Sequence, residues 1–443
     1  MQTKRKQFGQ YVIPSMIAMV GSSCYVLVDT LFIAHINDNA LAALNIVLPI
    51  YSLLIAFGSF VAVGASTYYS ILKAQNKMHE GSIYYTTAIV IGMAVSIATA
   101  IILMANKYTV AKFLGANDET LSMCIDYMNA YVPLSPFIVL QHLVTSFIRN
   151  DGDPKRASMA GFAGSMFNFV FDYFFIFTLN LGMFGAALAT GLAPVVGLCV
   201  CAPYYLKKKN QFHLIRCKFE LNVMKKIGSL GLPTLIQGVS SGIVTLVFNR
   251  QLLAIGGNMA VTAYGIIVNV SVVIQYLMSG VAEGVQPLVS SSYGGGLYED
   301  IRTYSKYSIR TVIGIASVGM AAVLLAGNGI ISVFDPSNNP ALRAMTLVGM
   351  IIYFIGLYPN GLNTFLAIFF TSVESPGPST LISILKTGIV IAPLVLILPI
   401  AFGLNGVWLS FLLSELLIET VGFVFFFSNK YIKKNRQGTQ NKV

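Results

Sequence analysis

The run IPSMIAMVGSSCYVLVDTLFIA, residues 13–34, decides the fold class. It follows the basic residues 4–6 and carries a single charged side chain, Asp29. About 20 apolar residues are enough to cross a bilayer as a helix. The start of the chain resembles a signal sequence, but the apolar run continues without a small-residue cleavage site. We therefore predict an uncleaved first membrane span over residues 10–34.

The whole chain is similarly rich in apolar residues and poor in charged ones. Of its 443 residues, 56% are hydrophobic and 10% are charged, and the mean hydropathy is +0.73. Soluble domains carry about 25% charged residues, and disordered chains combine low hydrophobicity with high net charge, so both classes are excluded. The sequence predicts an all-α integral membrane protein that crosses the bilayer many times.

The net charge of +11 does not indicate nucleic-acid binding. Nucleic-acid binders gather Lys and Arg on one folded face, whereas here these residues stand in short gaps between apolar runs. The five cysteines are odd in number and form no C-x-x-C pair, which argues against a disulfide framework or a metal site. We expect the cysteines to be buried, inert thiols.

Twelve windows have the length and hydropathy of membrane-spanning helices. They lie near residues 10–34, 44–70, 82–105, 125–149, 157–178, 184–206, 227–255, 262–290, 306–332, 343–372, 379–402 and 404–429. The gaps between them alternate in charge: one side of the membrane receives 22 Lys and Arg, and the other receives three. Because positive residues favour the cytoplasmic side, both termini are predicted to be cytoplasmic.

The sequence contains an internal repeat. Segments of the first half align with segments of the second at a nearly constant offset: Pro14 with Pro233, VAVG (61–64) with VAEG (281–284), and NDGDP (150–154) with ESPGP (374–378). Each half holds six predicted spans, so the two halves share one orientation and form a parallel 6+6 repeat around a central cavity. We predict a first lobe over 1–206, a basic cytoplasmic linker over 207–226, and a second lobe over 227–443 that ends in a basic cytoplasmic tail. This architecture is typical of alternating-access transporters, and no channel filter motif is present.

Ionisable groups inside membrane spans are costly and therefore indicate function. Asp29, Asp172 and Thr190 lie at one predicted depth, about 8–9 Å below the outer surface at 1.5 Å per helical residue. Asn168 precedes Asp172 by one helical turn and shares its face. Such an oxygen-rich cluster can hold Na⁺ or a proton, because crowded carboxylates in a low dielectric cannot all stay charged. Alternatively, each group hydrogen-bonds only to a neighbouring helix.

Further charged or titratable groups lie in the predicted spans. Glu283, which replaces Val63 of the first half, either attracts a cationic substrate in the cavity or pairs with Lys386 or a backbone group. Glu415 lies near the membrane midplane, and it contributes either to a buried packing pair with Glu419 or to substrate contact. His142 titrates near neutral pH but more often serves as a packing residue in a membrane helix.

Two uncharged positions complete the candidates. Gln237 follows Pro233 in the second-half repeat and is a candidate cavity residue. Pro14 removes a backbone hydrogen bond early in the first span. Its bend either acts as a hinge that couples protonation of Asp29 to cavity shape or is a static kink.

Together these residues resemble the multidrug and toxic compound extrusion (MATE) family. The resemblance covers essentially the whole chain, and its most specific segments are VDTLFIA (28–34), ALAALNIVLPI (40–50), RNDGDPK (149–155) and GVQPLVSSSYGGG (284–296). Within the family the chain is similar to the DinF-like branch of bacteria and archaea, nearest to MepA-type multidrug exporters, whose form of the eighth span VAEGVQP (281–287) matches. The resemblance implies a cation site at Asp29, Asn168, Asp172 and Thr190. The NorM-like branch carries carboxylates in its second lobe, but here Asn360 in YPNGLN (358–363) stands where an Asp is expected, so no second-lobe cation site is predicted.

The resemblance also implies an activity. We expect an H⁺- or Na⁺-coupled antiporter that exports amphipathic, mostly cationic compounds from a bacterial or archaeal cell and works as a monomer in the plasma membrane. It would contact membrane lipids and organic substrates, and it would need no cofactor besides the coupling ion. Alternatives are a lipid-linked oligosaccharide flippase, which would line its cavity with several Arg where this chain offers only Lys386, and a lipid-modifying membrane enzyme, for which the short loops supply no catalytic cluster.

Overall fold

The computed structural model describes residues 2–36, 38–218, 220–334 and 339–432, which fold into helices joined by short connections. The α-helices are α1 (Gln2–Ala34), α2 (Asp38–Ala74), α3 (Met78–Ala105), α4 (Lys107–Phe113), α5 (Leu121–Asp151), α6 (Pro154–Tyr173), α7 (Gly182–Leu206), α8 (Leu221–Gly294), α9 (Tyr298–Phe334), α10 (Pro340–Ser372), α11 (Pro376–Ile384), α12 (Ile391–Phe402) and α13 (Leu404–Ser428). Two π-helical turns extend α6 and α11, namely η1 (Phe174–Thr178) and η2 (Leu385–Ile389). The prediction of an all-helical membrane protein is confirmed.

Ten helical segments of the described residues are long and apolar enough to cross a membrane, against the twelve predicted. The difference arises where predicted spans are joined end to end. Windows 227–255 and 262–290 both fall in the 74-residue α8, which changes direction at Gly257, a glycine with φ 61° and ψ −159°. Windows 379–402 and 404–429 fall in α11–α13, where Gly388 (φ 108°) interrupts the first of them. The left-handed φ of these residues is readily adopted by glycine.

Two further details differ from the sequence expectations. The connection after α3 contains a short helix, α4, that was not predicted. Cys124 and Cys201 are buried as expected, but Cys24 and Cys199 are exposed. The expectation of burial fails for these two because the outer face of a membrane helix packs against lipid, so apolar side chains need no protein cover there. The basic tail predicted beyond Tyr431 falls mostly on residues 433–443, which lie outside the described residues.

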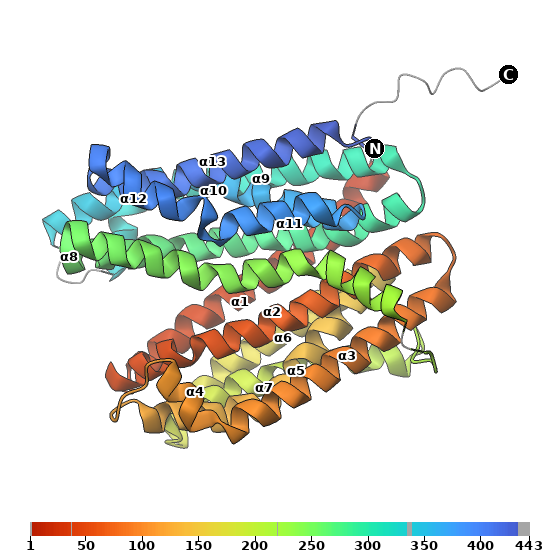
Figure 1. The fold of residues 1–443 in the computed structure, drawn as a ribbon, viewed down its shortest axis with the longest axis horizontal. Helices are drawn as coiled ribbons and strands as arrows, with labels where there is room; N and C mark the ends of the chain where they lie inside the picture. The colour runs from red at the N-terminus through yellow and green to blue at the C-terminus, as the bar shows by residue number, and fades with distance from the viewer. Residues whose placement is uncertain (1, 37, 219, 335–338, 433–443) are drawn as a thin grey trace.

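The helices form two bundles that lie side by side in Figure 1, α1–α7 in red to yellow-green and α8–α13 in green to blue. The N-terminus, the end of α13 and the α2–α3 and α8–α9 turns all lie at one end of the molecule. The connection between α7 and α8 runs at this same end. We call it the terminal end below.

At the terminal end the two bundles pack backbone against backbone through glycines. A Cβ atom on Gly64 of α2 would lie 2.1 Å from the carbonyl oxygen of Ile227 in α8. A Cβ atom on Gly284 of α8 would lie 2.7 Å from Cα of Val12 in α1. Gly64 and Gly284 are the aligned glycines of the repeated segments VAVG and VAEG. Small residues allow such close helix contacts in membranes.

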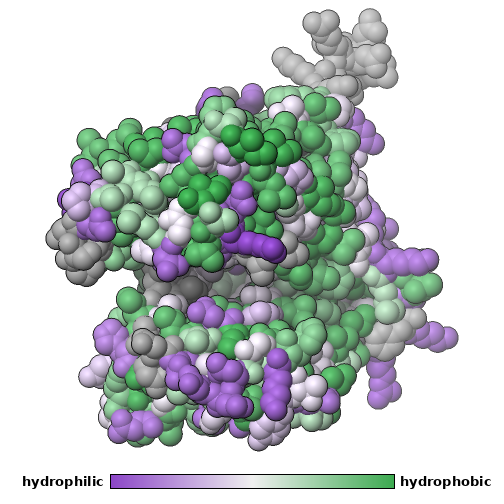
Figure 2. Space-filling model, turned by 60° about the vertical axis from the view of Figure 1, so that its left-hand side comes forward, coloured by the Kyte–Doolittle hydropathy of each residue, from purple (hydrophilic) through white to green (hydrophobic). Residues whose placement is uncertain are grey.

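The opposite end of the molecule is open. Figure 2 turns this end toward the viewer and shows a hollow between the upper and lower halves of the surface. The structure is therefore closed between the bundles at the terminal end and hollowed between them at the other.

Candidate functional site

Three polar side chains predicted to cluster in the first half do meet. Asn168 and Asp172 project from one face of α6, and Thr190 faces them from α7; all three are buried. In the orientation that satisfies both ends of its amide, Asn168 donates to Asp172 Oδ2 at 3.0 Å and accepts from the hydroxyl and the backbone N–H of Thr190, both at 3.2 Å. The amide thereby connects the carboxyl group of α6 to α7.

Asp29 of α1 completes this group. Its carboxyl and that of Asp172 lie within hydrogen-bonding reach of one another, a contact in which one of the two must carry a proton or share a cation. The Oδ1 oxygen of Asp29 is buried and accepts no hydrogen bond from the described residues. A buried acceptor without a partner is costly in the interior, so this oxygen is placed to receive a proton or a cation.

Tyrosines surround the two carboxyl groups, and the sequence analysis missed them. Tyr127 of α5 lies within hydrogen-bonding reach of the Thr190 side chain. It is also within electrostatic range of both Asp29 and Asp172. Tyr51 of α2 lies close to Asp29, and its hydroxyl contacts that of Tyr25. The prediction of the site relied on charged and polar residues at one depth in the membrane. A tyrosine carries no charge, so nothing in the sequence distinguishes these tyrosines from others in the spans.

The chemistry of this cluster follows from its donors. Two carboxyl groups, an amide oxygen and hydroxyl groups are hard oxygen ligands of the kind that alkali cations prefer. Among the described residues, neither Asp29 nor Asp172 forms an ion pair with Lys, Arg or His. The cluster therefore lacks a built-in positive charge and can accept one from outside.

The second half contains a different carboxylate cluster. Glu415 of α13 is buried, and its two carboxylate oxygens accept from the amide nitrogens of Asn360, at 2.9 Å, and Asn363, at 2.7 Å. The ammonium of Lys386, in η2, lies 3.6 Å from Glu415 Oε1. Lys386 therefore pairs with Glu415 and not with Glu283, which was one of the predicted alternatives. The turn at η2 directs Lys386 toward α13. Glu419 lies one turn beyond Glu415 and is half-buried.

Glu283 of α8 instead bridges the two bundles. Its carboxylate accepts a hydrogen bond of 2.8 Å from Arg149 of α5, and its side chain is 37% exposed. The helix α5 continues to Asp151, two residues beyond the predicted span, and carries Arg149 to the bundle interface. One turn along α8, Gln286 accepts from Asn150 and donates to Thr67 of α2. These polar contacts lie beside the glycine contacts described above.

The other candidates occupy separate places. His142 is close to Ser59, at 3.4 Å, between α5 and α2. Gln237 donates to Ser383 of α11 at 3.0 Å and so connects two helices of the second bundle. Pro14 lies within α1, which continues as a helix on both sides of it.

Asp151 anchors the connection between the bundles, a role that the sequence did not reveal. Its buried carboxylate accepts from the hydroxyls of Tyr69 (2.6 Å) and Tyr204 (2.7 Å), from Lys73 (2.6 Å) and from the backbone N–H of Gln211 (2.9 Å). A carboxylate with this many donors is well satisfied in the interior. It ties α2, α5 and α7 to the segment that leads to α8.

Comparison with known proteins identifies the family. The sequence model of the MatE family matches residues 14–174 and 233–397. The chain belongs to the MATE family. The two matched segments begin at Pro14 and Pro233, the prolines that the internal repeat aligns. MATE proteins are transporters and not enzymes, and the chain is accordingly a multi-pass membrane transporter of this family.

Similar MATE proteins include the multidrug export proteins MepA of two staphylococci. That of Staphylococcus haemolyticus is 28% identical over 93% of this chain and 90% of its own length. That of Staphylococcus saprophyticus is 26% identical over 91% and 89%. Among solved structures, an outward-facing MATE family multidrug resistance transporter of the MOP superfamily superposes with a TM-score of 0.90, at 21% identity, over 96% of this chain and 95% of that one. The predicted resemblance to MepA-type MATE proteins is confirmed, and the solved structure shows the same fold.

Proposed function

We propose that this MATE transporter is an antiporter that exports amphipathic, mostly cationic organic compounds in exchange for H⁺ or Na⁺. The observation that carries the proposal is the contact between the half-buried Asp29 and the buried Asp172, two acids on different helices that have no cationic partner among the described residues. Entry of a cation would satisfy Asp29 Oδ1 and draw α1 and α6 together. Departure of the cation would leave two carboxylates in contact, and their repulsion would favour separation of α1 from α6.

The arrangement of the bundles supports alternating access. We assign a first lobe to residues 1–206, a linker to 207–226 and a second lobe to 227–443, with six membrane crossings in each. In this assignment α8 supplies two crossings on either side of Gly257, and α11–α13 supply the last two. The aligned glycines Gly64 and Gly284 make corresponding contacts, as expected of a parallel repeat. With both termini cytoplasmic in a bacterial or archaeal plasma membrane, the hollow of Figure 2 opens to the outside.

Motion of α1 would connect the acid pair to the cavity. Pro14 removes one helical hydrogen bond in α1, between the terminal end of the helix and the part that carries Asp29. In our proposal, cation binding at Asp29 and Asp172 changes the bend at Pro14. Arg149 and Glu283 hold the cytoplasmic side closed in this outward-open state, and they separate when the transporter turns inward.

The substrate class is proposed from two considerations. The MepA relatives are named multidrug export proteins. Glu283, once it separates from Arg149 in the inward-facing state, would offer its carboxylate to an organic cation between the bundles. Gln237, His142 and Asn360 remain candidate cavity residues, while the contacts of Glu415 with Lys386 favour a structural role for that pair.

Transport into proteoliposomes tests the proposal. The purified protein is reconstituted with a fluorescent organic cation, and a pH gradient and a Na⁺ gradient are imposed separately. We expect one of the two gradients to accelerate export of the dye at least several-fold. Dye movement that responds to neither gradient would refute antiport, and the response to one gradient alone would identify the coupling ion.

A further inference from the structure

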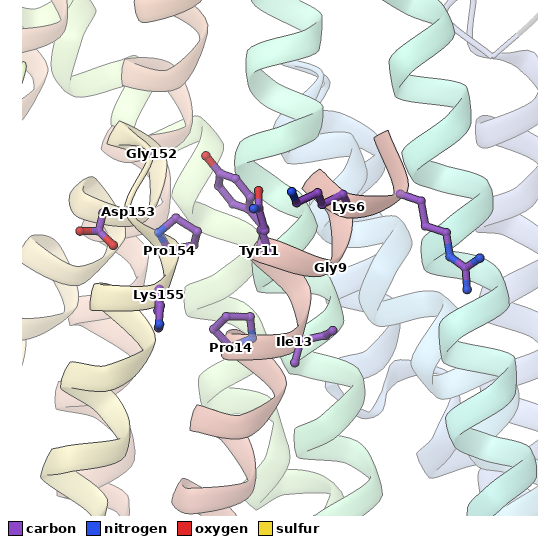
Figure 3. A pocket seen from close by; sticks show the side chains of 11 residues that line it. Lys6, Gly9, Tyr11, Ile13, Pro14, Gly152, Asp153, Pro154 and Lys155 are labelled. Atoms are coloured by element: carbon purple, nitrogen blue, oxygen red, sulfur yellow. The ribbon is translucent and has the colours of Figure 1, made fainter. Parts of the chain in front are cut away.

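A pocket of about 920 Å³ opens at the terminal end between the beginning of α1 and the beginning of α6 (Figure 3). Arg5 and Lys6 on α1 and Lys155 on α6 contribute three exposed cationic side chains to its lining. In Figure 3, Lys6 extends from α1 toward α6, and Lys155 stands on the side of α6 that faces α1. The pocket is thus cationic on both walls.

These three cations differ from their neighbours in lacking a carboxylate. At the same end, Lys4 pairs with Asp300, Lys73 with Asp151, and Arg156 with Asp153. None of the three pocket cations forms an ion pair within the part of the chain that the structure describes.

The single acid of the pocket does not neutralise it. Asp153 accepts from the backbone N–H of Arg156 at 3.0 Å and from its guanidinium at 3.1 Å, as the cap of α6. Figure 3 shows its carboxylate turned away from α1. The positive charge of the pocket therefore remains available to an anion from outside.

Farther along α1 and α6, the surface next to the pocket becomes apolar. Ile13 and Ile17 follow one another at one helical turn on α1 and are 58% and 54% exposed. Met159, one turn after Lys155 on α6, is 54% exposed. This surface ends where Gly21 of α1 meets the ring of Phe162. Exposed apolar side chains on membrane helices face acyl chains, so a ligand of the pocket and this surface has an anionic head and an apolar body.

We propose that this pocket binds one anionic phospholipid of the cytoplasmic leaflet. Its phosphate would lie between Arg5, Lys6 and Lys155, and an acyl chain would follow Ile13 and Ile17. Phosphate oxygens accept hydrogen bonds from Arg and Lys together with their charge. The lipid would bridge α1 and α6, the two helices that carry Asp29 and Asp172. Pro14 lies on the pocket wall, so an occupied pocket would restrain α1 at its bend.

Lipid binding to the purified full-length protein tests this site directly and without any transport measurement. Native mass spectrometry and thermal unfolding are recorded with phosphatidylglycerol, with phosphatidylcholine of the same chains, and with inorganic phosphate at equal phosphorus concentration. We expect one phosphatidylglycerol to bind at least tenfold more tightly than phosphatidylcholine and to raise the unfolding temperature. Equal binding of the two lipids, or equal protection by inorganic phosphate, would overturn the assignment.

Variants locate the site. The triple change Arg5→Gln, Lys6→Gln and Lys155→Gln should lower the affinity for phosphatidylglycerol at least tenfold. The matched control Lys207→Gln, Lys208→Gln and Lys209→Gln removes the same charge from exposed residues at the same end and should leave the affinity within twofold. Should the triple variant fail to fold, Lys155→Gln alone should weaken binding about threefold. Wild-type affinity in the variant obtained, or an equal loss in the control, would place the lipid elsewhere.

Discussion

The two bundles of this transporter each bury a carboxylate cluster, and the clusters are built in opposite ways. In the first bundle, Asp29 and Asp172 face one another with no cationic side chain paired to either among the described residues. In the second, Glu415 has Lys386 at 3.6 Å and two asparagine donors. A buried charge must be paired or neutralised. The second cluster has Lys386 of the chain itself as its cation, whereas in our proposal the first takes one from the solution.

In the proposed mechanism, this difference places the mobile ion in the first bundle. A cluster with its own ammonium has no need of a soluble cation, and its contacts join η2, α10 and α13. A cluster of two acids changes its contacts each time a cation enters or leaves. In the proposed mechanism, the two repeated halves have therefore diverged into a bundle that exchanges an ion and a bundle that does not.

The largest expected effect comes from breaking the second cluster. Lys386→Met leaves Glu415 buried without its counter-charge, and losing one partner of a buried pair typically costs about 3–5 kcal/mol of unfolding free energy. Unfolding of the purified variant in detergent should show this loss. The double variant Lys386→Met with Glu415→Gln should regain most of it, because no unpaired charge remains.

The same neutralisation in the first cluster should have the opposite outcome. Asp172→Asn removes one of two acids in contact and leaves no cation unpaired, so its unfolding free energy should equal or exceed that of the wild type. If Asp172→Asn were as destabilising as Lys386→Met, the two clusters would not differ in the way proposed.

A smaller effect is expected from the amides that support Glu415. Asn363→Ala removes a donor at 2.7 Å from the carboxylate, and a hydrogen bond to a charged group contributes about 1.5–3 kcal/mol. The measured loss of stability should fall in this range and stay below that of Lys386→Met. Asn363→Asp serves as the companion change, since it places a second acid against Glu415 and should be more damaging than alanine.

The smallest effect concerns the ion pair between the bundles. Glu283→Gln removes the partner of Arg149 at a site where the carboxylate is 37% exposed, and exposed pairs contribute about 0–1 kcal/mol. Its stability should therefore change little. Its conformational balance should shift toward the inward-facing state. In the Glu283→Gln background, a cysteine introduced by Gln286→Cys should therefore react faster with a thiol reagent than the same cysteine in a protein that keeps Glu283. An unchanged reaction rate would remove the pair from the closure of the cytoplasmic side.

The sequence predicted the first cluster better than the second because of the kind of information each needs. Asn168 and Asp172 are one turn apart on one helix, and the depth of Asp29 follows from counting along its span, so local geometry was sufficient. Which face a helix turns to its neighbours depends on packing. The pairing of Lys386 with Glu415 and of Arg149 with Glu283 therefore could not be predicted, since both join separate helices. The joining of two predicted spans in α8 through Gly257 likewise was not predicted.

Gradient-driven export by Asp172→Asn, compared with the Lys386→Met, Glu415→Gln double variant, tests the central claim most directly. Both proteins are reconstituted at equal amounts, and dye exchange without a gradient is measured first to show that each is folded and binds substrate. We predict that the double variant still responds to the gradient that drives the wild type, whereas Asp172→Asn exchanges dye but responds to no gradient. Wild-type acceleration by Asp172→Asn would contradict the account.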